Sequence, residues 1–99
     1  MKKKSRTLAY DSAGYLDSAE AINAYMEEAF EMKDPAFIAK ALGTVTRARG
    51  MSRIAKKAGL SRESLYKALS SEGNPEFGTI LRVMHALGLK FSIRATPAR

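Results

Sequence analysis

The chain has 99 residues, carries a net charge of +7 and contains no cysteine. This length predicts one domain with a modest hydrophobic core, and the lack of cysteine excludes disulfides and thiolate metal sites. No apolar run approaches the length of a membrane span, and no apolar stretch follows the basic first residues as it would in a signal peptide. We therefore expect a cytoplasmic protein without membrane contact.

The charge is distributed in blocks. Residues 1–10 carry a net +4, residues 11–36 hold seven acidic side chains against one basic one, and residues 47–67 hold seven basic side chains against one acidic one. The last block predicts a phosphate-binding surface. The alternative is a highly charged surface that is simply solvated.

Residues 1–16 show no helical periodicity and are expected to form a flexible arm, with a short strand at residues 7–10 as one alternative. The domain proper is predicted at residues 17–99. Its first helix should begin at Asp17, with Glu20 completing a capping box. Apolar residues then repeat at helical spacing from Ile22 to Phe30, and the opposite face is acidic.

Asp34 and Pro35 end the first helix and start the second, as N-cap and first helical residue. The second helix should run to Arg49 and stop at Gly50. Its buried stripe follows helical spacing and consists of Phe37, Ile38, Ala41, Leu42 and Val45.

The next segment, residues 54–74, reads as a helix-turn-helix. A short helix over residues 52–58 ends at Gly59, and Ser61 caps a further helix over residues 62–69. Leu65 and Leu69 lie one turn apart on the inner face of that helix. This layout is required of a helix that fits the DNA major groove and reads bases near its N-terminus.

Four side chains on the outer face of this second helix are the predicted base-reading residues: Arg62, Glu63, Ser64 and Lys67. Arginine and lysine can reach guanine O6 and N7, and a glutamate can accept from cytosine N4. For Glu63 the alternative is a favourable charge at a helix N-terminus.

A second group is expected to contact phosphate and so to position the protein without reading sequence. It consists of Arg49, Arg53, Lys56, Lys57, Ser61, Ser71 and Asn74. Ser61 is also a helix cap, and the stronger interpretation of Asn74 is a cap for the fifth helix. Tyr66 lies at the edge of the interface or packs.

Asn74 and Pro75 repeat the cap-and-proline signal, and a fifth helix with Gly88 as its stop should follow. Residues 89–94 then alternate between apolar and polar, which predicts a short C-terminal strand. Because a lone strand leaves its backbone unbonded, it needs a partner. The candidates are the arm, another protein, or a second copy joined through Leu89, Phe91 and Ile93, and we expect a homodimer.

Catalytic signals are weak. His85 is the only histidine, no nucleophile motif or glycine-rich phosphate loop is present, and the adjacent pair Glu27 and Glu28 diverges on a helix. We therefore expect a protein that is not an enzyme and that has no metal and no cofactor.

The run from residue 54 to 89 resembles the lambda-repressor-like (Cro and Xre type) helix-turn-helix domain. A larger resemblance, over residues 15–93, is to the addiction-module antidote family of HigA-like antitoxins. The motifs that carry both are Asp34-Pro35, Ala41-Leu42-Gly43, residues 47–52, Ile54-Ala55, residues 59–69, Gly73-Asn74-Pro75 and Ala86-Leu87-Gly88-Leu89. One departure is Gly50-Met51, which stands where many such domains have Thr-Gln with a phosphate-contacting glutamine; Arg49 or Arg53 would have to replace that contact.

The resemblance implies an all-α, five-helix antitoxin that binds a RelE/HigB-type toxin and represses its own operon at a palindrome of double-stranded DNA. No motif marks the toxin surface. Our hypothesis is the acidic face of the first helix, which carries Glu20, Glu27, Glu28 and Glu31, against a solvated face as the alternative. Two other functions stay open: a stand-alone helix-turn-helix repressor, and an interaction module that has lost DNA binding.

Overall fold

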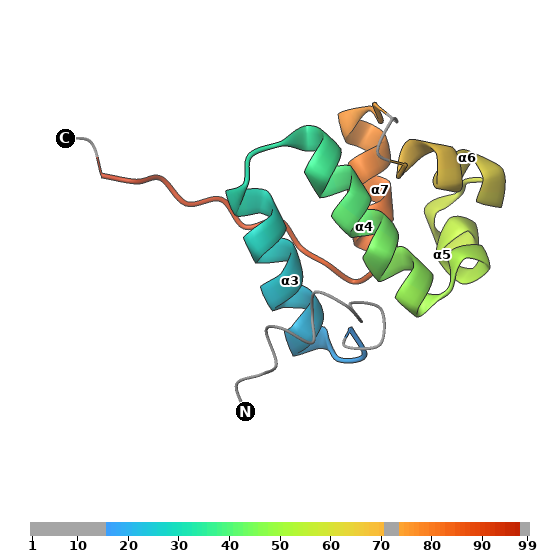
Figure 1. Ribbon diagram of the computed structural model, residues 1–99, viewed down its shortest axis with the longest axis horizontal. Coiled ribbons are helices and arrows are strands. Elements are labelled where there is room, and N and C mark those ends of the chain that lie inside the picture. The colour runs from blue at the N-terminus through green and yellow to red at the C-terminus, as the bar shows by residue number, and fades with distance from the viewer. Residues whose placement is uncertain (1–15, 71–73, 98–99) are drawn as a thin grey trace.

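The computed structural model describes residues 16–70 and 74–97, and these form five helices and no strand (Figure 1). The helices are α3 (Ala19–Glu31), α4 (Pro35–Arg49), α5 (Met51–Ala58), α6 (Arg62–Ala68) and α7 (Phe77–Ala86). The prediction of an all-α fold with five helices is therefore confirmed for this part of the chain. The alternative strand at residues 7–10 lies outside it.

Helix α3 begins later than the sequence predicted. Ser18, not Asp17, is the N-cap, with extended backbone and a hydroxyl oxygen that accepts from the N–H of Ala21 at 3.1 Å. Both residues are good caps, so the choice between neighbours depends on packing. Leu16, which we had placed in the arm, is only 1% exposed and belongs to the core.

Helix α4 begins and ends where the sequence predicted. The Asp34 carboxylate accepts from the N–H of Ala36 at 3.2 Å, and Pro35 is the first helical residue. Gly50 ends the helix with φ 107°, a conformation that L side chains rarely adopt. Helix α5 follows at once from Met51, one residue before its predicted start.

The helices pack in chain order around one core. Helix α3 lies on α4, α4 contacts α5, and α5 contacts both α6 and α7. The largest fully buried side chains are Leu16, Leu42, Val45, Thr46, Leu65 and Val83. Helix α4 runs through the middle of the fold, with α3 on one side and α5 and α6 on the other (Figure 1).

Helix α7 starts two residues later than the Asn74-Pro75 signal predicted. Its N-cap is Glu76, which makes no side-chain capping bond, so the interpretation of Asn74 as a cap is wrong. The other end agrees with the sequence. Gly88 has φ 82°, and the N–H of Leu89 donates to Met84 O at 2.8 Å, which closes the helix in a Schellman motif.

The predicted C-terminal strand is absent from the described residues. Residues 89–97 run past α3 and α7 and then away from the body as an extended segment with no ladder partner (Figure 1). A strand is defined by backbone bonds to a neighbour, and none of residues 16–70 and 74–97 supplies one here. Among the described helices, none is long and apolar enough to cross a membrane.

Candidate nucleic-acid interface

The turn between α5 and α6 is built by three consecutive residues with separate roles. Gly59 adopts the left-handed conformation at φ 73°. The N–H of Leu60 donates back to Ala55 O at 2.9 Å, which satisfies a carbonyl at the end of α5. Ser61 then caps α6, because its hydroxyl oxygen accepts from the N–H of Ser64 at 2.9 Å. Gly59 and Ser61, predicted from the sequence as a helix stop and a helix cap, thus form with Leu60 a tight turn between two short helices.

Arg82 of α7 holds this turn in place. Its Nε donates to Ala58 O at 3.2 Å and its Nη2 to Gly59 O at 3.1 Å. Carbonyls at a helix C-terminus lack intrahelical donors and carry partial negative charge, so a guanidinium there is favourable. Sequence reasoning missed this residue, since the contact joins positions far apart in the chain.

Gly43 sets how closely α4 approaches the end of α6. A Cβ built at Gly43 would stand 3.1 Å from the carbonyl oxygen of Leu69 and 3.5 Å from its Cβ. Helix α6 is anchored from within by Leu65, which is fully buried, and by Leu69. An isolated glycine inside a helical pattern is a signal of close packing, and here it fits that meaning.

The predicted base-reading residues lie together on the exposed face of α6. Arg62, Glu63, Ser64 and Lys67 are all exposed. Glu63 and Lys67 are one turn apart, with the acidic residue first, which is the favourable order for a pair along a helix. Tyr66 is 65% exposed and does not pack into the core. With Ser61, Arg62 and Glu63 it lines an open hollow on this surface.

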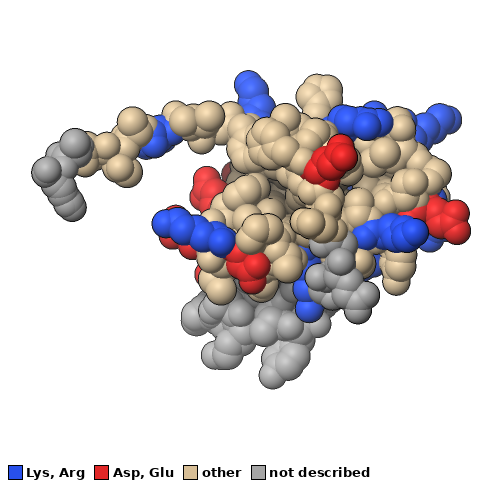
Figure 2. All heavy atoms as spheres, turned by 90° about the horizontal axis from the view of Figure 1, so that it is seen from above, with Lys and Arg blue, Asp and Glu red and all other residues tan. Residues whose placement is uncertain are grey.

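The predicted phosphate-contacting residues are less uniform. Five of them are exposed: Arg53, Lys56, Lys57, Ser61 and Asn74. Arg49, at the end of α4, is half-buried, and Ser71 lies outside the described residues. Figure 2 shows basic side chains projecting around the end of the molecule that carries α5 and α6, with acidic side chains both there and toward the opposite end. The exposed acidic residues of α3 and the exposed basic residues of α5 and α6 lie on different helices.

Comparison with known proteins gives a direct result. The model of a family described as "probable addiction module antidote protein" matches residues 6–95. The chain belongs to this family. An "Uncharacterized protein" of Haemophilus influenzae is 48% identical over 85 residues, which are 86% of this chain and 88% of the relative. No solved structure matches.

Membership in the antidote family implies a toxin as partner in general terms. The four acidic residues that we assigned to toxin binding are all exposed on α3: Glu20, Glu27, Glu28 and Glu31. The opposite face of α3 is buried on α4 through Ile22 and Met26. Helix α3, which carries these acidic residues, and the pair α5 and α6 lie on opposite sides of α4 (Figure 1).

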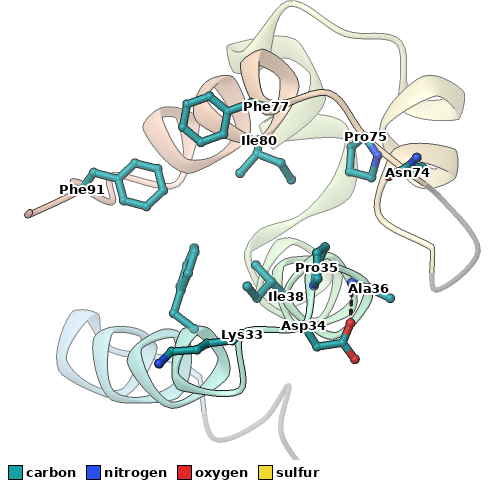
Figure 3. A pocket seen from close by; sticks show the side chains of 11 residues that line it. Lys33, Asp34, Pro35, Ala36, Ile38, Asn74, Pro75, Phe77, Ile80 and Phe91 are labelled. Carbon is teal, nitrogen blue, oxygen red and sulfur yellow. Dashed lines mark hydrogen bonds between the residues drawn. The ribbon is translucent and has the colours of Figure 1, made fainter.

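The three residues assigned to dimerisation have different surroundings. Leu89 is half-buried against the core. The Phe91 ring packs edge-on against Phe30 at 5.6 Å between centroids and stacks on Phe77 at 6.2 Å (Figure 3). Ile93 is 95% exposed. The structure therefore half-buries Leu89, partly covers Phe91 and leaves Ile93 in solvent.

Proposed function

We propose that the chain is the antitoxin of a type II toxin–antitoxin module, which neutralises a RelE/HigB-type toxin and represses its own operon. The observation that carries this proposal is the antidote-family match, which extends over residues 6–95 and so includes every described helix. The chain acts by binding, without enzymatic activity or a cofactor.

DNA binding is assigned to α5 and α6, acting as a lambda-repressor-like helix-turn-helix. Three features support it: the tight turn at Gly59, the exposed polar face of α6, and the basic side chains around that end. In this proposal Arg62 and Lys67 read bases, while Lys56 and Lys57 bind phosphate. Glu63 either accepts from a cytosine or is a favourable charge at the N-terminus of α6.

Repression at a palindrome requires two copies, with recognition helices about 34 Å apart on successive major grooves. We assign the dimer contact to the C-terminal segment, through Leu89, Phe91 and Ile93. The exposed alternating pattern of this segment and its lack of a ladder partner support that assignment.

Toxin binding is assigned to the acidic face of α3. A basic toxin would be steered to it by complementary charge, and the separation from α6 would let one copy hold toxin and DNA together. Reversing the charges of Glu20, Glu27, Glu28 and Glu31 should weaken toxin binding while leaving operator binding intact. Reversing Arg62 and Lys67 is the matched control, which should do the opposite.

The first test is growth of cells that express the adjacent small open reading frame, with and without this chain. Arrest that the chain rescues supports the antitoxin. No arrest, or arrest without rescue, contradicts it and favours the second candidate, a stand-alone helix-turn-helix repressor. That candidate rests on the α5–α6 surface alone, and steep loss of DNA affinity with rising salt would support it.

A further inference from the structure

The C-terminal segment leaves the body of the molecule at a fixed point. Phe91 is held between Phe30 of α3 and Phe77 of α7, beside an apolar groove of about 720 Å³ that these rings share with Ile38 and Ile80 (Figure 3). Phe77 is nonetheless 67% exposed and Phe91 44% exposed. The rings that anchor the segment are therefore covered on one side only.

Beyond this point the segment has the chemistry of an unpaired strand. Ile93 is 95% exposed, and none of the described backbone hydrogen bonds involves residues 90–97. Apolar side chains alternate with Lys90, Ser92 and Arg94. A row of free backbone groups with one apolar face is a template for pairing with another strand.

We propose that residues 89–93 pair antiparallel with the same residues of a second copy, with Phe91 on the two-fold axis. This inference rests on the proposed homodimer and specifies its geometry. Leu89 then lies opposite Ile93 of the second copy, and each Phe91 lies opposite its equivalent. Opposite residues of antiparallel strands share a face, so three apolar cross-strand pairs form on the side of the ribbon that faces the helices.

The charges of Lys90 and Arg94 favour this register over registers with the axis on another residue. Like charges placed directly opposite destabilise a strand pair. With Lys90 or Arg94 on the axis, that residue would face itself, and with Ser92 on the axis, Lys90 would face Arg94. With Phe91 on the axis, Lys90 lies opposite Ser92 instead.

Two further registers also fail. An axis on Ile93 would avoid the charge clash, but it would set Leu89 opposite Pro97 and Phe91 opposite Ala95, so of the three large apolar side chains only Ile93 would face another. A register shifted by half a step would place apolar side chains opposite polar ones and break the apolar face. The axis at Phe91 is thus the register that sets the large apolar side chains Leu89, Phe91 and Ile93 opposite one another without a charge clash.

This arrangement explains why one copy leaves Ile93 in solvent. A two-fold axis normal to the ribbon keeps the apolar faces of both strands on the same side. Ile93 of each copy therefore lies beside Leu89 of the other copy and over the helices of that other copy. The burial site of Ile93 is therefore on the second copy. In the same dimer, the free backbone groups of residues 89–93 form hydrogen bonds with residues 89–93 of the second copy.

The first experiment measures the oligomeric state of the purified full chain by sedimentation equilibrium. We expect a dimer, and Ile93→Asp should raise its dissociation constant by at least about tenfold, because a buried isoleucine contributes more than one factor of ten. Tyr66→Asp, which alters an exposed apolar side chain on α6, is the matched control and should leave the dimer intact. A monomeric wild-type chain, or a dimer indifferent to Ile93→Asp, overturns the proposal.

The second experiment determines the register by disulfide formation between introduced cysteines. Because the native chain has no cysteine, no other disulfide can form. Directly opposite residues have Cα atoms within disulfide range. A mixture of Lys90→Cys and Ser92→Cys chains should form the mixed disulfide faster than either chain forms its own. The Ser92→Cys chain keeps the charges of Lys90 and Arg94. If two copies of this chain form a disulfide rapidly with each other, the axis lies on Ser92 and the proposed register is wrong. Neither experiment uses toxin or DNA. A negative result therefore contradicts the proposed dimer geometry, whereas failure of growth rescue contradicts the proposed antitoxin function.

Discussion

Arg82 donates from Nη2 to the carbonyl oxygen of Gly59 at 3.1 Å, and this bond ties α7 to the turn between α5 and α6. The same guanidinium reaches Ala58 O through Nε. The orientation of the proposed recognition helix is thus determined in part by a residue outside the two helices of the motif.

Replacing Arg82 with alanine should lower the free energy of unfolding by about 1 kcal/mol, because two carbonyls at the end of α5 lose their donor. Urea unfolding followed by circular dichroism measures this. Arg94→Ala removes the same charge from the exposed C-terminal segment and should change stability by far less. Equal losses in the two variants would mean that net charge, and not the Arg82 contact, is responsible.

Gly43→Ala should destabilise the chain by about 1–3 kcal/mol, because its Cβ would press on Leu69 O at 3.1 Å and force α4 and α6 apart. Gly78 offers a matched control in α7, where an added Cβ meets nothing within 4 Å. Gly78→Ala should raise stability by about 0.5–1 kcal/mol through helix propensity. Thermal unfolding compares the two. A stabilising Gly43→Ala would contradict the close-approach argument.

Thr46 is fully buried, and its hydroxyl oxygen has no hydrogen-bond partner among the residues that the structure describes. Thr46→Val keeps the branched shape and removes that polar atom, so stability should rise by about 1 kcal/mol. The control is Thr44→Val, since Thr44 Oγ1 donates to Lys40 O at 3.3 Å and accepts from Arg47 at 3.4 Å. That control should give no gain. Denaturant midpoints of both variants decide the matter.

Lys33 follows α3 at φ 55°, in the left-handed region that glycine adopts without steric penalty. Lys33→Gly should therefore stabilise the chain by up to about 1 kcal/mol. Lys40→Gly makes the same chemical change inside α4 and should destabilise by about 1 kcal/mol. Opposite signs in calorimetric melting temperatures are expected, and a loss in both variants would contradict the assigned strain.

The proposed DNA contacts predict two kinds of defect. Arg62→Ala should reduce the preference for the operator over unrelated DNA by about 1–3 kcal/mol, since it removes a base contact. Lys56→Ala should weaken binding to both DNAs alike and flatten the salt dependence. Fluorescence anisotropy over a series of salt concentrations measures both. If the Arg62→Ala chain keeps the wild-type preference for the operator over unrelated DNA, Arg62 does not read a base.

Local signals in the sequence predicted local structure well. The caps at Asp34 and Ser61 and the breaks at Gly50 and Gly59 depend on bonds that span a few residues, so they can be read without the fold. The exposed face of α6 follows from the inward spacing of Leu65 and Leu69 in the same way.

Features that depend on distant residues could not be read from sequence. Asn74 precedes a proline as Asp34 does, yet the helix there begins after Glu76. Arg82 and Gly43 act on residues far along the chain; a glycine inside a helical pattern signals close packing, but no spacing rule names the partner of either residue. The strand predicted at residues 89–94 is not formed, because a strand needs a neighbour as well as an alternating pattern, and the described part of the chain provides none.

The aromatic contact at Phe91 links two equilibria. Helix α3 packs chiefly on α4, and the Phe91 ring adds a second attachment, from the end of α3 at Phe30 to α7 at Phe77. Opening of the last turn of α3 and release of the C-terminal segment therefore share one contact, so the amide exchange of that turn should respond to release of the segment. By thermodynamic linkage, whatever immobilises the C-terminal segment also disfavours opening of the last turn of the helix that bears the acidic residues.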